Sequence, residues 1–388
     1  MSGWWGIWQL LCALLLVASF VYWGLAWISL WRWRPHLKEM DDGRAPEVSS
    51  WPRVSLLKPL HDAEPGLGTS ILAAARQNYP RYTLLCGVQR PADPAISVLE
   101  ALRQQHPELP LYWHLHDCRL GSNPKVNNLA GISTLGLAEC LVIQDADIVV
   151  GPDYLRHVVA PLQDPEVGLV TCLYRPRPDQ RFWSRVLAVQ IQELFLPSVL
   201  TATRLGPTIY CAGATMALGR DTLERCGGWR AIADSLADDY ALGACVRAQG
   251  KRIALSDYVV DTQVAEASFR DFHRHALRWA RTTRSVQPLG HAFSFLSYPG
   301  PLTVLLAPWL GWPGWSLIPV VLTLRLVYHR AIAKQLKNPL PPAAVWLGDM
   351  LALVIWAEAW ISRRVYWRGG DFAYDSHGRM RGGDGVER

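Results

Sequence analysis

The 388-residue sequence lacks any CxxC pair, and the spacing of its eight cysteines matches no metal-binding pattern. Several cysteines lie in apolar runs typical of buried strands, so we expect reduced thiols in a core and no disulfide framework. Internal repeats and low-complexity blocks are also lacking. The length permits one large domain together with membrane segments.

Charge is absent from residues 4–31, a stretch longer than the roughly 20 residues that cross a bilayer. Basic residues are missing before this stretch, which argues against a cleavable signal, whereas Arg32, Arg34 and Lys38 follow it. We therefore predict a retained N-terminal transmembrane anchor over residues 1–34, with the domain that follows it in the cytoplasm.

The basic clusters typical of nucleic-acid-binding proteins are missing too. The formal net charge is +6, but the Lys and Arg residues are scattered and gather beside apolar segments. Anionic lipid headgroups explain this distribution better than nucleic acid does. We expect a membrane, and no nucleic acid, among the partners.

Short β-rich runs alternate with helical stretches between residues 52 and 284, as a Rossmann-like, mainly parallel α/β sheet requires. The candidate strands are residues 54–58, 82–88, 111–115, 139–144, 168–173 and 209–218. In such sheets ligands bind at the carboxyl ends of the strands.

Further apolar stretches at 292–310, 313–328 and 342–361 predict C-terminal membrane segments within residues 290–365, followed by a cytoplasmic tail at 366–388. Three full crossings would place the basic C-terminus opposite the domain, against the positive-inside tendency. We therefore expect the Pro-rich segment around 298–301 to be re-entrant or interfacial.

The apolar stretch at 182–200 carries polar residues along its length, namely Arg185, Gln190, Gln192 and Glu193. We expect an interfacial amphipathic helix that admits a lipid to the cleft, and not a span. The alternative is that its apolar stripe packs as core, because periodicity alone does not separate the two.

Residues 141–152, LVIQDADIVVGP, place Asp145 and Asp147 directly after a strand-like run. An unpaired buried carboxylate is costly, but two carboxylates one residue apart can share a divalent cation, the usual partner of a diphosphate. The alternative is a solvated pair that caps the next helix.

Two later segments also carry candidate site residues. LADDYALG (236–243) opens a predicted helix with Asp238 and Asp239, one of which can act as a general base if it faces the cleft; capping is the alternative. HRHALRWARTTR (273–284) gathers four arginines on about three helical turns. These arginines either hold a diphosphate or form a basic membrane-surface face.

The motifs occur in a recognisable order: KPLHDAEPGL (58–67), VQRPADPAI (88–96), NPKVNNL (123–129), DADI (145–148), CAGATMALGR (211–220), LADDY (236–240) and HALRW (275–279). Together they resemble the ceramide glucosyltransferase family of GT-A glycosyltransferases over about residues 54–284. Within that family the sequence is most similar to bacterial hopanoid-biosynthesis enzymes, which transfer N-acetylglucosamine from UDP-GlcNAc to bacteriohopanetetrol.

The resemblance implies roles for several acidic and basic residues. Asp93 would contact the uridine nucleotide, and Asp145 and Asp147 would bind Mg²⁺ or Mn²⁺. Asp239 would be the catalytic base. Lys125 would add a cation to the donor site, unless it is a lysine at the edge of the core.

The remaining candidate residues are Asp238 and the three residues of the last motif. Asp238 is expected to bind substrate beside the catalytic base. His275, Arg278 and Trp279 would form the (Q/R)xxRW element. His275 stands where the broader family has Gln or Arg, a departure that weakens a strict ceramide-type assignment and that the hopanoid-like branch tolerates.

The function implied is that of a multi-pass enzyme of the bacterial inner membrane that transfers a sugar, with inversion, from a UDP-sugar to a lipid hydroxyl. The alternatives are a ceramide glucosyltransferase that uses UDP-glucose and a processive polysaccharide synthase, for which the membrane segments are too few. A membrane scaffold or transporter would have no reason to place carboxylates after strands and would instead put polar residues inside its spans.

Overall fold

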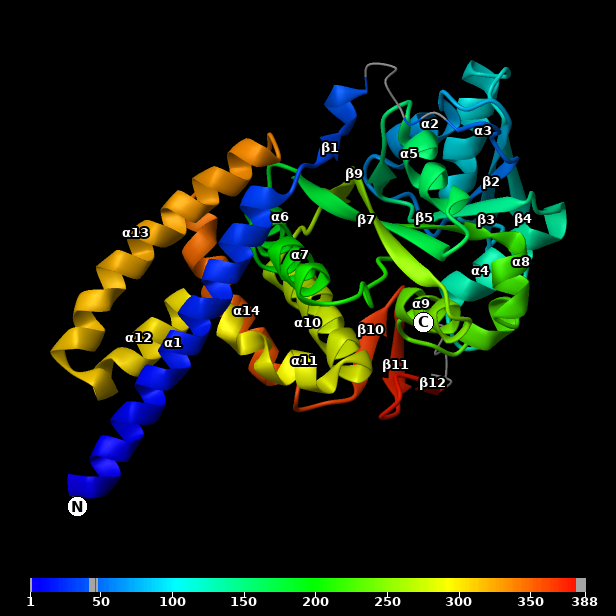
Figure 1. Ribbon diagram of the computed structural model, residues 1–388. Helices are drawn as coiled ribbons and strands as arrows, with labels where there is room; N and C mark the ends of the chain where they lie inside the picture. Colours follow the sequence, from blue (N-terminus) through cyan, green and yellow to red (C-terminus); the bar gives the residue numbers. More distant parts are fainter. Residues whose placement is uncertain (1, 42–45, 47, 382–388) are drawn as a thin grey trace. The chain divides into compact units, whose positions relative to one another are not determined.

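The computed structural model describes residues 2–41, 46 and 48–381, and it divides into two compact units (Figure 1). The sheet unit consists of Arg34–Arg175, Pro207–Gln263 and Tyr366–Arg388. The helical unit consists of Met1–Trp33, Pro176–Gly206 and Val264–Val365. The expected domain at 52–284 is therefore interrupted, because 176–206 and 264–284 belong to the helical unit.

One mixed sheet organises the sheet unit, with strand order β1-β9-β7-β8-β5-β2-β3-β4 and with β6 paired to β9. β2 is parallel to β3 and β5, and β3 is parallel to β4, whereas β8 runs antiparallel to β5 and β7. The strands are His36–Leu37 (β1), Val54–Pro59 (β2), Tyr82–Val88 (β3), Leu111–Leu115 (β4), Cys140–Gln144 (β5), Ile148–Val149 (β6), Val167–Pro178 (β7), Thr215–Gly219 (β8) and Arg252–Val264 (β9). The α/β fold class is confirmed, although the last predicted strand begins at 215 and not at 209.

The central strands are apolar along their whole length because helices cover both faces of the sheet. On one face, side chains of β2, β3 and β5 pack with α2, α3 and α5; examples are Leu56, Leu84 and Val142. On the other face, the alternate side chains pack with α4 and α9; examples are Leu57 and Ile143. The helices of the sheet unit are Leu67–Ala75 (α2), Ala95–Gln105 (α3), Pro124–Ile132 (α4), Tyr154–Val159 (α5), Arg220–Arg225 (α8) and Asp238–Ala248 (α9).

The C-terminal segment differs from the expected tail. Its strands Arg364–Trp367 (β10), Gly370–Tyr374 (β11) and Met380–Arg381 (β12) form a second, three-stranded sheet. From Tyr366 onward this segment belongs to the sheet unit, where it is tied by backbone hydrogen bonds to the loop before α9. Residues 382–388 of the expected tail lie outside the described residues.

Most apolar helices lie in the helical unit. They are Ser2–Arg32 (α1), Phe182–Gln190 (α6), Leu196–Leu205 (α7), Phe269–Val286 (α10), Pro288–Phe293 (α11), Pro299–Leu310 (α12), Trp312–Gln335 (α13) and Ala343–Glu358 (α14). Within the described residues, three stretches are long and apolar enough to cross a membrane: Trp4–Arg32, Phe182–Leu205 and Trp312–Gln335. Helix α12, at 12 residues, rises only about 18 Å, which is less than a bilayer core.

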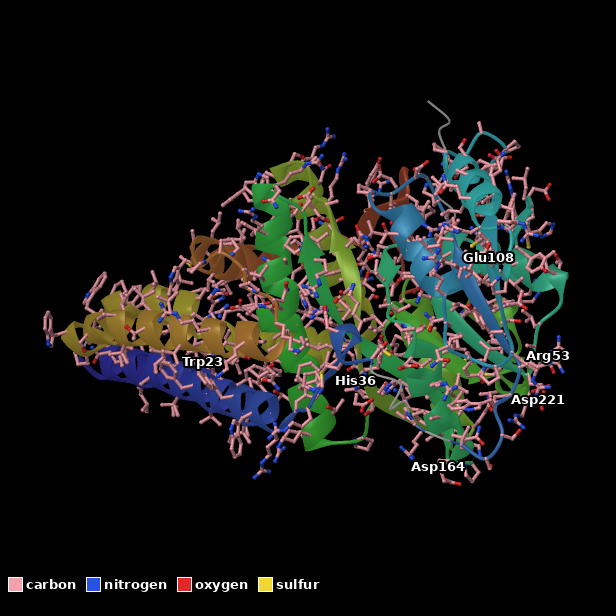
Figure 2. The ribbon with its side chains drawn as sticks, turned by 90° about the horizontal axis from the view of Figure 1, so that it is seen from above. Trp23, His36, Arg53, Glu108, Asp164 and Asp221 are labelled. Atoms are coloured by element: carbon pink, nitrogen blue, oxygen red, sulfur yellow. The ribbon has the colours of Figure 1, made fainter. Side chains whose placement is uncertain are left out.

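Aromatic side chains join α1 to the C-terminal helices. Trp23 of α1, labelled in Figure 2, packs against Tyr328 of α13 with 5.7 Å between ring centroids. The rim of the sheet unit in the same view carries charged side chains, such as Arg53, Glu108 and Asp221, all of them exposed. The composition of the two surfaces agrees with membrane association of the helical unit.

The stretch at 182–200 is broken by a π-helical turn, Ile191–Phe195 (η4), which lies between α6 and α7. Several residues of its apolar stripe are fully buried within the helical unit, among them Val186, Leu187 and Leu196. Phe182, at its start, is about half exposed. The alternative of packing as core thus accounts for the buried part of the stripe, and contact with an interface stays a prediction for its exposed end.

A buried ionic cluster fixes the π-helical turn to two C-terminal helices. Arg325 of α13 donates from Nη1 to Glu193 at 2.5 Å and from Nε to Asp349 of α14 at 2.7 Å. His329 lies one turn further along α13, and its Nδ1 is 2.6 Å from the other oxygen of Glu193. All four side chains are buried. The polar residues that suggested an interfacial helix thus include one, Glu193, that is paired inside the helical unit.

We expect Arg325→Ala to destabilise the helical unit by about 3–5 kcal/mol, because it leaves two carboxylates buried without their shared cation. Thermal unfolding in detergent measures the effect. The matched control is Lys334→Ala, which removes an exposed cation from the same helix and should leave the midpoint within a degree or two of the original. Equal midpoints for both variants would contradict the prediction.

Candidate active site

The carboxyl end of β5 is where the first pair of predicted site residues lies. Asp145 follows the strand directly, and Asp147 lies just before β6. Lys58 of the neighbouring strand β2 is fully buried, and its Nζ donates to Gln144 Oε1 at 2.7 Å and to the Asp145 carbonyl at 2.8 Å. Burial lowers the pKa of Lys58 to about 8. This lysine holds the strand end in place through the backbone and leaves the carboxylates to other partners.

Lys125 connects Asp145 with Asp238. It lies in the first turn of α4, where the Asn123 side chain caps the helix by accepting from the Lys125 and Val126 amides. Its Nζ is 2.7 Å from Asp145 Oδ1 and 3.4 Å from Asp238 Oδ2. Burial opposes the charge, but Asp145 and Asp238 raise the pKa of Lys125 above its usual value. The structure therefore places Lys125 within the acidic cluster, so a solitary lysine at the edge of the core is excluded.

The Asp147 side chain accepts a short hydrogen bond from the Thr262 hydroxyl of β9. Burial, and then the nearby charge of Asp145, raise the pKa of Asp147. A divalent cation would remove this cost, since Mg²⁺ and Mn²⁺ are commonly held by one or two carboxylates plus substrate phosphates. The two aspartates fit such an ion, and the alternative of an ordinary helix cap fails, because neither caps a helix.

Asp239 is positioned by the start of α9 and by the segment before β8. Its Oδ2 accepts from the Gly213 amide at 2.8 Å, and its Oδ1 accepts from its neighbour Tyr240 at 2.7 Å. Burial, followed by the charge of Asp238, raises the pKa of Asp239 to about 6. A carboxylate with this pKa is suited to accept a proton near neutral pH.

Gly213 marks the point where these groups converge. A Cβ atom placed there would lie 2.9 Å from Lys125 Nζ, 3.3 Å from Asp239 Oδ2 and 3.4 Å from Asp145 Oδ2. The strand-end aspartate, the lysine and the proposed base therefore surround one small volume. The absence of a side chain at 213 leaves this volume open between them.

Asp93 lies in the loop between β3 and α3 and is almost fully buried. Its carboxylate accepts from the amides of Ala95 and Asp62 at 3.0 and 3.2 Å, and from Arg90 Nη2 at 3.1 Å. Burial favours the protonated form, but these hydrogen bonds outweigh it and hold the pKa of Asp93 below its usual range. Asp93 shapes the loop, and its contact with a nucleotide stays a prediction.

The last motif lies on α10 of the helical unit, not in the sheet unit. His275 Nδ1 is 2.7 Å from Glu266 Oε1, and its ring meets the Trp279 ring edge-on with 4.4 Å between centroids. Arg278 lies on the same helix. His275 therefore links Glu266 to Trp279, and the contact of the three residues with the donor remains a prediction.

Two residues at the site were missed by the sequence analysis. Lys58 appears in the quoted segment KPLHDAEPGL, and the signal that would have found it is a lysine inside an otherwise apolar central strand. Gly213 appears in CAGATMALGR, but a glycine in a sequence carries no sign of what its missing side chain would meet. The roles of both residues at the site depend on neighbours that are distant in the chain.

Among the described residues, one set of three potential metal ligands lies within 4.8 Å of one another, namely His36, Asp41 and His157. Protein groups already account for Asp41. It is 2.9 Å from His36 Nε2 and also accepts from the Asp153 amide and the Tyr258 hydroxyl. This group serves to fasten the segment after α1 to the sheet.

The comparisons with known proteins cover nearly the whole chain. The model of glycosyl transferase family 21 matches residues 11–380. Ceramide glucosyltransferase 3 of Caenorhabditis elegans is 22% identical over 89% of this chain and 76% of its own length. Ceramide glucosyltransferase 1 of the same organism is 22% identical over 61% of this chain, which spans about half of that relative.

A solved structure shows the same fold. The mannosyltransferase PcManGT from Pyrobaculum calidifontis, in complex with GDP-Man and Mn²⁺, superimposes with a TM-score of 0.54. It is 20% identical, and the match covers 89% of this chain and 99% of that one. The family match extends over both units and includes every predicted site residue, so the chain belongs to glycosyl transferase family 21 and is a glycosyltransferase.

Proposed function

We propose that this enzyme transfers a sugar from a UDP-sugar to the hydroxyl group of a membrane lipid, with inversion at the anomeric carbon. The observation that carries the proposal is the convergence of Asp145, Lys125 and Asp239 around Gly213 at the carboxyl end of β5. Ligands of open α/β sheets bind at this edge. A cation-binding aspartate pair and a carboxylate suited to accept a proton are the two functions that such a transfer needs.

The site residues have separate roles in the proposed reaction. Asp239 accepts the proton of the lipid hydroxyl, and the Gly213 amide keeps its carboxylate in place. Lys125 and Lys58 limit repulsion among the carboxylates before the donor enters. A divalent ion held by Asp145 and Asp147 would offset charge on the leaving diphosphate, and the Mn²⁺ in the PcManGT complex supports this expectation.

N-acetylglucosamine and bacteriohopanetetrol are the donor sugar and the acceptor that we favour. His275 supports this assignment, because the resemblance places His in the hopanoid-like branch. The second candidate is transfer of glucose from UDP-glucose to ceramide, which the names of both curated relatives favour. In either case the protein would be multi-pass, in the bacterial inner membrane, with its sheet unit in the cytoplasm.

UDP release by the purified protein in detergent tests the proposal. We expect release from UDP-GlcNAc to rise when bacteriohopanetetrol is added, and to rise less with UDP-glucose and ceramide. Mass spectrometry of glycolipids from cells with and without the chain identifies the product. Acceptor-independent release, or a polymeric product, would sink the proposal.

Asp147→Ala should weaken Mn²⁺ binding by about tenfold or more, because one of two ion-holding carboxylates is lost. Isothermal titration of Mn²⁺ in the presence of UDP measures this directly, and turnover should fall to near background. Asp221→Ala removes an exposed carboxylate of α8 and serves as the control. Near-normal turnover of Asp147→Ala in excess Mg²⁺ or Mn²⁺ would rule out the metal role.

Asp239→Asn should bind UDP-sugar normally but lose about 10²–10⁴-fold in kcat, since the amide keeps the shape and cannot accept a proton. The matched variant is Asp238→Asn, whose loss should be smaller. Steady-state kinetics and donor titration of both variants give the comparison. If Asp238→Asn were the more damaged enzyme, the base would have to be reassigned to Asp238.

The rate should depend on pH through Asp239. Because the pKa of this carboxyl is raised to about 6, it is protonated and inactive below that pH and becomes a base above it. We expect kcat/KM to rise tenfold per pH unit below about 6 and to level off above it. The residual activity of Asp239→Asn should not show this rise with pH. If the rise persists in the variant, another group is responsible for the titration.

A further inference from the structure

The turn that joins β10 to β11 has an unusual residue at its tip. Its two residues, Arg368 and Gly369, both have positive φ angles, of 47° and 80°. Hairpin turns of this type favour Asn, Asp or Gly, because a Cβ atom is crowded in the left-handed region. A long side chain at 368 therefore costs stability, and such costs are retained where the side chain has a use.

The guanidinium group of Arg368 carries a hydrogen-bond donor that no described part of the chain satisfies. Its Nη1 is buried and has no hydrogen-bond partner among the residues that the structure describes. A buried donor without a partner is costly, more so when it is charged. Burial lowers the pKa of Arg368, and the carboxylates of Asp145, Glu64 and Asp238 oppose this shift.

The sheet that contains this hairpin is fastened to the loop before α9. Met380 of β12 donates its amide to the Asp234 carbonyl at 2.7 Å, and the Leu236 amide donates to Gly378 at 2.9 Å. The loop thus engaged leads directly into α9, which begins with Asp238. The sheet that carries the turn is therefore hydrogen-bonded to the segment that leads into the acidic cluster, within the sheet unit.

We propose that Arg368 binds the diphosphate of the nucleotide-sugar donor, beside the aspartates at the end of β5. This inference rests on the proposed function and adds a binding residue that lies outside the motifs of the catalytic region. A planar guanidinium presents several N–H donors in a geometry that matches phosphate oxygens. The donor diphosphate would supply the partner that Nη1 lacks, and Arg368 would hold the diphosphate while it leaves.

A purely structural role is the competing explanation. The Arg368 guanidinium lies over the Trp367 ring, 5.5 Å from its centroid, and this contact could by itself favour arginine at the turn. The two roles differ in what glycine at 368 would do. Glycine suits the backbone angle and relieves the strain, so a structural role predicts a protein that binds nucleotide as before.

The experiment compares Arg368→Gly with the full-length parent in detergent, by isothermal titration with UDP and with uridine in the presence of Mn²⁺. We expect the dissociation constant for UDP to rise about tenfold or more, because a charge-assisted contact to phosphate is lost. The constant for uridine, which has no phosphate, should stay unchanged. The dissociation constant of Arg368→Lys for UDP should lie between those of the parent and Arg368→Gly. Lysine keeps the positive charge but lacks the planar guanidinium that can donate two parallel hydrogen bonds.

Lys337→Gly is the matched control. Lys337 also has a positive φ angle, of 49°, is exposed and lies in the helical unit, so its replacement relieves similar strain without touching the acidic cluster. UDP affinity should not change in this variant. Unchanged UDP affinity in Arg368→Gly, or equal losses for UDP and uridine, would overturn the proposal. A parent protein that failed to bind UDP at all would instead refute the proposed function.

Discussion

The candidate site depends on keeping several carboxylates together at the end of one buried strand. Their mutual repulsion and their loss of hydration both oppose this arrangement. Two lysines from neighbouring elements reduce that cost: Lys58 binds the backbone of the strand end, and Lys125 pairs with Asp145 and Asp238. Burial, and then the repulsion that remains, raise the pKa values of Asp147 and Asp239, and a bound cation would offset this cost.

The polar framework around this cluster explains how segments far apart in the chain reach one place. Asn123 caps the helix that carries Lys125, and its side chain also donates to the Ser235 carbonyl at 2.7 Å. The same loop receives the Met380 amide of β12. One loop therefore links α4, α9 and the C-terminal strands, and a shift of any of them would move a site residue.

The helical unit also keeps charged side chains buried, in this case among apolar helices. Arg325 bridges Glu193 and Asp349, so three helical segments share one buried ionic contact. Such a contact adds little net stability over an apolar core, but it is costly to break and it specifies which helices meet. In a set of helices with similar apolar surfaces, this selectivity is the physical use of charges that hydropathy alone would treat as unfavourable.

The sequence by itself determined the α/β class, the positions of most central strands and the order of the acidic motifs, because these depend on local patterns. The central strands are recognisable as apolar runs because both of their faces are buried. The motifs DADI and LADDY are short enough to be identified in the sequence directly. It could not reveal that Glu193 is paired with Arg325, that strands lie within 364–381, or that Lys58 and Gly213 lie beside the aspartates. Those features depend on partners distant in the chain, and only the tertiary structure decides which distant residues become neighbours.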